Sequence, residues 1–351
     1  MSPKISVVIP SYNYGKYLRQ CVRSAAEQSC VDHEVVIVEN GSTDGSLDIA
    51  RSLANEYPNV RLVSFTSNAG IVASINRCWS EVRGEYAVLL CADDLLTSGS
   101  LARSLAFMEL HPNVGLIFGP ADEFSGDDAP TETPYAMRGS PPVIHSGEAW
   151  ITERCRSGIN PIFAPEAMFR TEMLRKVGPA PPELPHTFDL YLWLRIASET
   201  DVAYLTGPLQ ALYRRHPSNH SVAYRRNVLM EMQQLWAAFE QFFLTIASHS
   251  KRAAWEMLVR KSLAKEIRYC AAREFSLAGG GLASSDYKPL LVFADTLDPA
   301  ISSRAGREFA WAIRVRVGPR AANLIPTLWV AIFHRLFQRY LWKRRARRMG
   351  I

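Results

Sequence analysis

Short apolar runs alternate with amphipathic segments through the N-terminal third of the chain. The apolar runs, rich in β-branched residues, occupy 5–10, 34–38, 60–65 and 86–91. The segments between them have helical spacing and occupy 17–28, 46–56 and 71–82. Strands that alternate with helices in this way are typical of βαβ units, whose parallel strands are buried on both faces. The sequence therefore predicts an α/β fold with a mostly parallel sheet flanked by helices.

Two adjacent acidic residues, Asp93 and Asp94, closely follow the run at 86–91. In open α/β folds, ligands bind at the carboxyl edge of the sheet, where this pair should lie. Adjacent carboxylates disfavour each other's ionised form, and a bound cation would remove that penalty. Carboxylate oxygens suit Mg²⁺ or Mn²⁺, and Mg²⁺ is usually held together with substrate phosphates. The pair therefore indicates either a metal–phosphate site or a solvated turn.

Polar loops follow two of the other predicted strands. Residues 11–15 come after the run at 5–10, and residues 39–45 come after the run at 34–38. Because parallel strands end at the same edge of a sheet, these loops should lie beside the acidic pair. A polar cluster of this extent predicts a nucleotide site.

In order and spacing, several motifs resemble those of family 2 glycosyltransferases. They are Ser6–Asn13, Glu39–Asp44, Asn68–Gly70 with Asn76, Gly84–Tyr86 and Ala92–Asp94. The resemblance covers about residues 4–221 and implies the GT-A fold, which is built on a Rossmann-like sheet. It also implies inverting transfer of a sugar from a nucleotide-diphosphate donor, with a divalent metal such as Mg²⁺ or Mn²⁺.

The resemblance also assigns roles to individual residues. The implied donor-binding residues are Pro10, Ser11, Tyr12, Glu39, Asn40, Asn68, Gly70, Asn76, Asp93, Arg214 and Arg215. The implied metal ligands are Asp94, Asp93 and His216, with Asp94 the more direct ligand. Arg214 and Arg215 belong to a segment, 212–221, that is similar to the family's Tyr-Arg-x-His segment. Their guanidinium groups suit phosphate binding. In the same segment, His216 is either a metal ligand or a hydrogen-bond donor to the diphosphate.

The chain departs from the family pattern at residues 39–40, where the family often has Asp-Asp, and at residue 91. Asn40 stands where the family often has Asp, but its side-chain oxygen can still accept a bond from a pyrimidine imide. Uridine and thymidine donors therefore both remain open. Cys91 stands where the family often has a further Asp, so the charge of the metal must rest on Asp93 and Asp94.

Asp189, at the start of an apolar helical segment, is the predicted general base. Taken alone, an acid in this place is most simply a helix N-cap. By resemblance it corresponds to the Asp of the family's Glu-Asp pair, and Phe188 replaces the Glu. With the upstream motifs present, we favour the role of general base.

The resemblance and the change of pattern along the chain predict two domains. A catalytic domain occupies residues 1–221, with a donor half at about 1–120 and an acceptor half at about 121–221. Within the acceptor half, residues 122–147 are rich in Pro, Gly and Asp, which predicts a long loop or lid. Residues 222–351 are predicted to be helical, with long helices at 227–247 and 251–277.

The basic charge of the chain is concentrated at its C-terminal end. The formal net charge is +6, yet ten of the 40 Lys and Arg residues follow Glu308, where no acidic residue occurs. The tail at 324–351 combines an amphipathic segment with a basic end, which suits contact with an anionic membrane surface. The alternative is a helix docked on the protein. No recognised nucleic-acid motif accompanies the tail, so no nucleic-acid partner is expected.

We expect a cytoplasmic enzyme that lies peripherally at the inner face of the membrane. The six cysteines are scattered, as in a reduced protein, and no signal peptide is predicted. The predicted activity is hexosyl transfer, in polysaccharide biosynthesis, from a UDP- or dTDP-sugar to a glycan or lipid-linked glycan. The alternative is an inactive nucleotide-sugar-binding module with a membrane- or nucleic-acid-binding tail. A nucleotidyltransferase is disfavoured. Such enzymes usually hold the triphosphate with a Gly-rich, basic loop after the first strand, whereas residues 10–16 contain one Gly and one Lys.

Overall fold

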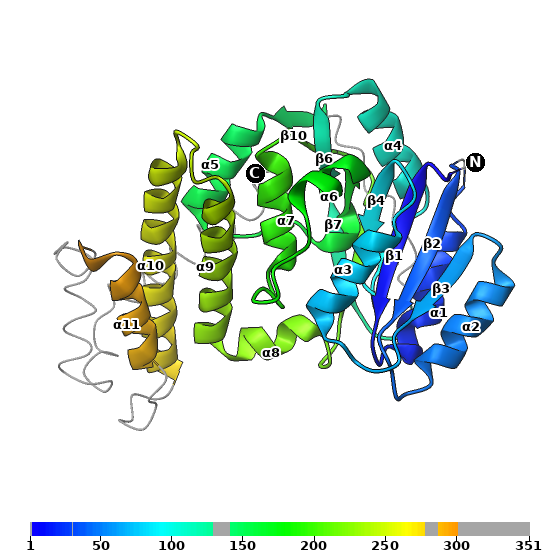
Figure 1. Cartoon of the computed structure of the whole chain (residues 1–351). Helices are drawn as coiled ribbons and strands as arrows, with labels where there is room; N and C mark the ends of the chain where they lie inside the picture. Colours follow the sequence, from blue (N-terminus) through cyan, green and yellow to red (C-terminus); the bar gives the residue numbers. More distant parts are fainter. Residues whose placement is uncertain (1, 30, 129–140, 278–286, 301–351) are drawn as a thin grey trace. The chain divides into compact units, whose positions relative to one another are not determined.

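The computed structural model describes residues 2–29, 31–128, 141–277 and 287–300 (Figure 1). The chain divides into two compact units. Among the described residues, the first unit contains those up to 151 together with 161–220, and the second contains 152–160 and those that follow 220. The predicted tail at 324–351 lies outside the described residues.

Strands and helices alternate through the first unit, as the sequence predicts. Its N-terminal elements are β1 (Ile5–Ser11), α1 (Gly15–Ala26), β2 (His33–Glu39), α2 (Ser46–Glu56), β3 (Val60–Ser64), α3 (Ile71–Glu81) and β4 (Tyr86–Leu89). The elements that follow are β5 (Leu95–Leu96), α4 (Ser100–Leu110), β6 (Val114–Phe118), β7 (Ala121–Ser125), β8 (Val143–His145), α5 (Gly147–Ser157), η1 (Ala164–Glu166), β9 (Ala167–Arg170), α6 (Thr171–Val177), α7 (Phe188–Ala197), β10 (Asp201–Tyr204) and β11 (Ala211–Arg215). Helix α5 continues into the second unit.

In the described residues, the main sheet has the strand order β3-β2-β1-β4-β9-β6-β10-β8. The strands from β3 to β4 are parallel, whereas β9 is antiparallel to both β4 and β6, and β8 is antiparallel to β10. The register of β1 places Ile9 opposite Ile37 on one side and Val8 opposite Leu89 on the other. The prediction of a mostly parallel sheet is confirmed.

Apolar residues on the two faces of this sheet pack against different helices. On one face, Ile9 and its neighbours join Leu18 of α1 and Leu53 of α2 in one buried cluster. On the other face, Val8 joins Ile75 of α3. Burying each such side chain contributes about 1.5–3 kcal/mol, so the double-sided burial fixes the helices on both faces.

A second sheet in the described part of the chain has the order β5-β11-β7. Strand β11 is parallel to β7 and antiparallel to β5, so residues 211–215 lie beside residues 121–125. The prediction of a loop over 122–147 is therefore wrong at its two ends, where β7 and β8 form. Residues 129–140 lie outside the described residues. The strand at β7 has little alternation of its own, and its pairing with a distant strand defines it.

The second unit is helical, as predicted. It contains most of α8 (His220–Arg226), α9 (Val228–Thr245), α10 (Arg252–Leu277) and α11 (Tyr287–Leu297). Phe239, Phe242 and Phe243 of α9 are buried. Trp255 of α10 donates from its indole nitrogen to the Thr152 hydroxyl over 2.8 Å. Among the described residues, no helix combines the length and the hydropathy needed to cross a membrane.

Candidate active site

The carboxyl ends of β1, β2 and β4 lie side by side, because β1 pairs with both of the other strands. Two polar loops, residues 11–15 and 39–45, therefore adjoin the segment at 91–94. We call these loops the loop frame and residues 91–94 the acidic segment. Gly41 in the frame has a φ of +70°, and a Cβ there would lie 2.5 Å from the Ser67 carbonyl carbon. Glycine is required at this position to let the next loop approach.

Side-chain to backbone hydrogen bonds join the two loops of the frame. The Asn13 side-chain oxygen accepts from the Thr43 N–H over 2.8 Å, and the Asn13 N–H donates to the Ser42 hydroxyl over 2.9 Å. The Gly15 N–H donates to Asp44 Oδ2 over 3.0 Å. Asn13 has a φ of 57°, in the left-handed region that Asn adopts more readily than most residues. These bonds fix the relative position of the two loops.

Glu39, a predicted donor-binding residue, is fully buried at the end of β2. Its carboxylate accepts from the backbone N–H groups of Gly41 and Ser42 over 3.0 and 2.8 Å. A buried carboxylate needs such donors, and here both of its oxygens have one. In the structure Glu39 therefore shapes the frame, and its contact with a donor stays a prediction.

Asn40, the predicted reader of the base, also bonds within the protein. Its Oδ1 accepts from the Ala69 N–H over 3.0 Å, while its Nδ2 donates to Asn68 Oδ1 and to the Gly70 carbonyl. The side chain thus ties the predicted residues Asn68 and Gly70 to the frame. An amide oxygen has two lone pairs, so a second donor can still approach it.

The other donor-binding residues predicted in the N-terminal part of the chain lie in two places, at the end of β1 and on α3. Pro10 and Ser11 end β1, and Tyr12 is 37% exposed in the frame. The Ser11 hydroxyl is buried and has no hydrogen-bond partner among the described residues. Asn76 lies on α3, where its amide both donates to and accepts from the Ala180 backbone. Asn76 therefore anchors the loop that precedes α7.

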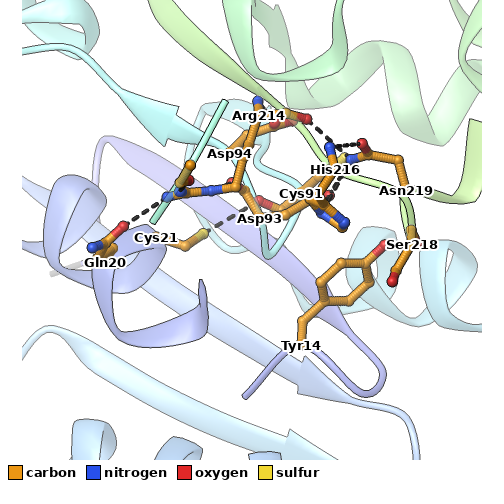
Figure 2. A network of polar contacts seen from close by, with 11 residues as sticks. Tyr14, Gln20, Cys21, Cys91, Asp93, Asp94, Arg214, His216, Ser218 and Asn219 are labelled. Atoms are coloured by element: carbon orange, nitrogen blue, oxygen red, sulfur yellow. Dashed lines mark hydrogen bonds and ion pairs between the residues drawn. The ribbon is translucent and has the colours of Figure 1, made fainter. Parts of the chain in front are cut away.

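The acidic segment holds Asp93 and Asp94 in different ways (Figure 2). The Asp94 side chain is fully buried, and its Oδ1 accepts from the Arg214 N–H over 2.9 Å. Its Oδ2 is buried without a hydrogen-bond partner among the described residues. Asp93 Oδ2 accepts from Asn219 Nδ2 over 2.8 Å and lies 3.1 Å from His216 Nε2. Burial raises the pKa of Asp94 well above its ordinary value, and the charge of Asp93 is the second-largest cause of the rise.

These residues fit a divalent cation. Ligand atoms of Cys91, Asp93 and Asp94 all lie within 4.8 Å of one another. Asp94 combines a buried, unpartnered oxygen with a like charge next to it, and a cation would stabilise both. Burial and the two carboxylates also raise the pKa of the Cys91 thiol. His216 contacts Asp93 but does not belong to this group of ligand atoms.

The Arg214 side chain is fully buried behind the acidic segment. Its Nε donates to the Asp93 carbonyl over 2.9 Å, and its Nη2 donates to Gln20 Oε1 over 2.6 Å. Its Nη1 donates to the carbonyls of Gly126 and Asp127. The guanidinium also lies 4.7 Å from the Tyr17 ring centroid. Arg214 therefore supports the acidic segment, and its predicted contact with phosphate stays a prediction.

Arg215 and His216 follow on the same strand end. The Arg215 guanidinium pairs with Glu123 over 2.6 Å, and both side chains are partly exposed. The His216 ring packs against Tyr17, with ring centroids 4.7 Å apart. Both residues thus have protein partners, and their predicted roles in phosphate and metal binding stay predictions.

Asp189 lies in the first turn of α7, and the N-cap of that helix is Thr187. The alternative role of Asp189 as the N-cap is therefore not realised. The Asp189 side chain is partly buried, and Oδ1 accepts from the Leu190 N–H over 2.8 Å. The charge of Asp189 contributes to the raised pKa of Cys91. Asp189, nearly a hundred residues later in the chain, thus lies near enough to Cys91 to act on it electrostatically.

The two departures at Cys91 and Phe188 share an environment. Both side chains pack against the buried cluster that contains Val8, Leu89 and Ala164. Each replaces an acidic residue of the family pattern at the border of this apolar cluster. Neither residue supplies a carboxylate to the site.

Two polar residues at the site had no role assigned from the sequence. Gln20 of α1 accepts from Arg214, and Asn219 donates to Asp93 and bonds the His216 backbone (Figure 2). Asn219 lies within the segment 212–221 that carries the resemblance, so the position of Asn219 in this motif could have indicated a role at the site. Gln20 has no local signal, because its partner comes from the far end of the domain.

Comparisons with known proteins point to one family. The model of glycosyl transferase family 2 matches residues 6–176. A protein of Nostoc described as an uncharacterized glycosyltransferase is 32% identical over 187 residues, which is 51% of this chain and 54% of that protein. Chondroitin synthase of Pasteurella multocida is 40% identical over 94 residues, or 27% of this chain and 10% of that protein. The matched region thus spans about half of the first relative and a tenth of the second.

Solved structures show the same fold. S. aureus TarS in complex with UDP-GlcNAc is similar with a TM-score of 0.63 and 17% identity, covering 90% of this chain and 87% of that one. The same protein in complex with UDP has a TM-score of 0.61. At this identity the likeness concerns the fold alone. It confirms the predicted class of a mostly parallel sheet with a helical C-terminal part.

Proposed function

We propose that this chain, whose residues 6–176 match the model of glycosyl transferase family 2, transfers a sugar from a nucleotide-diphosphate donor to a hydroxyl group. The donor is a UDP- or dTDP-sugar, and the acceptor is a glycan or a lipid-linked glycan. The observation that carries the proposal is the buried Asp94 with its unpartnered oxygen, beside Asp93 and next to the loop frame. The complex of the structurally similar TarS with UDP-GlcNAc supports a uridine donor.

Asp93 and Asp94 would hold Mg²⁺ or Mn²⁺, with His216 beside them. Bound there, the cation would neutralise the charge that develops on the leaving diphosphate. Arg214 keeps the carboxylates in place through its backbone N–H, which donates to Asp94, and through its Nε, which donates to the Asp93 carbonyl. Asn219 fixes the orientation of Asp93. The protein thus presents the two carboxylates in a rigid arrangement.

The loop frame would enclose the base and ribose of the donor. Its loops are fixed by the bonds of Asn13 and Asp44, and Tyr12 is exposed for contact. The second lone pair of Asn40 Oδ1 would accept the imide N–H of a pyrimidine. The buried Ser11 hydroxyl and the backbone at Pro10 would complete this wall.

Asp189 would remove the proton from the acceptor hydroxyl as that oxygen attacks the anomeric carbon. General bases of this kind contribute about 10²–10⁴-fold to a rate. Attack from the face opposite the leaving diphosphate inverts the anomeric configuration.

A donor screen tests the proposal. The full chain with Mn²⁺ is mixed with UDP-, dTDP- and GDP-sugars, and thermal shift and slow donor hydrolysis are measured. We expect stabilisation and hydrolysis with a uridine or thymidine donor. The Asp94→Asn variant, with the same shape and one charge fewer, is the matched control. Absence of any response in the wild-type protein would contradict the proposal.

A second candidate is a module that binds nucleotide sugars without transferring them. The replacement of two family acids by Cys91 and Phe188, both at the border of an apolar cluster, favours it. Such a module would show the thermal shift with a donor but no hydrolysis and no transfer to any acceptor. Measuring both quantities in the same samples separates the two candidates.

We propose further that the tail at 324–351 binds an anionic membrane surface, so that the enzyme acts at the cytoplasmic face. The composition of the tail supports this, since ten basic residues and no acidic residue follow Glu308. Salt-sensitive co-sedimentation with phosphatidylserine vesicles, but not with DNA, is the expected result. Equal binding to DNA would overturn the membrane assignment.

A further inference from the structure

Cys91 brings a sulfur atom to the two carboxylates of the acidic segment. The sulfur lies within 4.8 Å of ligand oxygens of both Asp93 and Asp94. Two ligands on opposite sides of one cation are separated by roughly 4.5 Å when one bond is to sulfur and the other to oxygen. The limit of 4.8 Å is slightly above this span, so an inward movement of the side chains is needed before one cation contacts all three groups.

The backbone holds Cys91 in this place. Its carbonyl accepts from the Asp94 N–H over 3.0 Å, which folds the acidic segment into a tight turn. The same carbonyl accepts from the Cys21 thiol over 3.3 Å (Figure 2). The Asp94 carboxylate is fixed in turn by Arg214. The three ligand groups are thus preorganised before a cation binds.

Asp94 supplies a second and independent sign of a ligand. It is fully buried, and its Oδ2 has no hydrogen-bond partner among the described residues. A buried carboxylate oxygen without a donor is costly unless a cation or another ligand contacts it. Asp94 belongs to the same group of possible ligand residues as Cys91.

We propose that Cys91 is a thiolate ligand of this cation site and gives it a preference for thiophilic divalent cations over Mg²⁺. Soft thiolates favour cations such as Zn²⁺ or Cd²⁺, whereas carboxylates and water suit Mg²⁺ and Mn²⁺. Binding of the cation releases the thiol proton to solvent. The inference rests on the proposed function, because it concerns the same cation site.

The competing explanation is that Cys91 only packs against the apolar cluster that Phe188 also borders. In that case the sulfur would contact no cation. The Cys91→Ser variant, with a side chain of similar size, would then bind cations as well as the wild-type protein does. A sulfur-to-metal charge-transfer band distinguishes the two, because it arises only when sulfur is bonded to the cation.

The experiment is a titration of the metal-free full chain with Cd²⁺, followed by ultraviolet absorbance. We expect a charge-transfer band that saturates at one equivalent in the wild type and in the Cys270→Ser control, and that is lost in Cys91→Ser. Since even the loss of an outer-shell partner costs about 10–100-fold in metal affinity, Cys91→Ser should weaken Cd²⁺ binding by at least about tenfold. Cys91→Asp should shift the preference toward Mn²⁺ by a similar factor.

Each outcome decides one question. A band that persists in Cys91→Ser, or wild-type binding of Mn²⁺ without any Cd²⁺ band, overturns the thiolate ligand and leaves the proposed function standing. Failure of the wild type to bind either cation or a nucleotide sugar overturns the proposed function as well. Should Cys91→Ser fail to fold, ¹¹³Cd nuclear magnetic resonance of the wild type reports directly whether sulfur is a ligand.

Discussion

The loop frame and the acidic segment lie at the same edge of one sheet, yet their polar side chains are used differently. In the frame, Glu39, Asn13 and Asp44 accept hydrogen bonds from the backbone of the loops. In the acidic segment, Asp94 leaves one buried oxygen without a partner among the described residues. Polar residues of a motif can thus either build the shape of a site or remain available for a ligand.

The difference has a thermodynamic consequence. A side chain whose hydrogen bonds are all satisfied within the protein stabilises the fold, and its loss is expected to lower the free energy of unfolding. A buried carboxylate with one unpartnered oxygen and a like charge beside it destabilises the fold, and its neutralisation should cost activity instead. Substitutions in the two regions should therefore affect different measurements.

The two largest effects are expected on transfer activity, and the first of the substitutions that should cause them is Asp94→Asn. The variant keeps the shape of the side chain but removes the charge that would hold a cation, so transfer should fall by about 10²–10³-fold. Its free energy of unfolding should be unchanged or higher, because a buried charge is removed. Turnover with Mn²⁺ and unfolding in urea are the two measurements. Full turnover together with a large loss of stability would place Asp94 with the frame instead.

The next effect concerns Asp189→Asn, which removes the proposed base and leaves the acidic segment intact. The turnover number should fall by about 10²–10⁴-fold, while the dissociation constant of the donor stays the same. Glu172→Gln, an exposed acid on α6, serves as the matched control. Equal turnover in the variant and the wild type would remove Asp189 from the mechanism.

In the loop frame, Glu39→Gln should act mainly on stability. A glutamine oxygen can still accept one bond, but the other backbone N–H of Gly41 or Ser42 then faces the amide NH2 group and loses its acceptor. The free energy of unfolding should fall by about 1–3 kcal/mol, measured by urea denaturation. Asp48→Asn on the exposed face of α2 should change it by less than about 0.5 kcal/mol. A Glu39 variant of normal stability that has lost donor binding would show direct contact with the donor.

The smallest effect is expected at Asn13, where the left-handed backbone and the bond to Thr43 can be separated. Asn13→Ala loses both, and should lower the free energy of unfolding by about 1–2 kcal/mol. Asn13→Gly restores the conformational freedom and should recover part of that loss. Identical values for the two variants in urea denaturation would mean that the backbone conformation carries no cost.

The local pattern of the sequence was enough to predict the parallel sheet and the loops that meet at its edge. The reason is physical: buried parallel strands are apolar along their length, and chain direction alone places their carboxyl ends together. The order of the motifs along the chain also predicts that Asp93, Asp94 and the loop frame lie at one edge of the sheet. The mostly parallel sheet and the helical C-terminal part could therefore be predicted from the amino-acid sequence alone.

Only the tertiary structure decided which polar atoms are consumed within the protein and which remain for a ligand. The bonds of Arg214 to Asp94 and Gln20 cross 120 and 194 residues of chain. They depend on the pairing of β11 with β7, where no alternation in the sequence marks the strand. Hydrogen-bond partners are set by register and side-chain packing over such distances, and a local pattern carries no information about either. The free oxygen of Asp94 and the sulfur of Cys91 beside it emerge at that level.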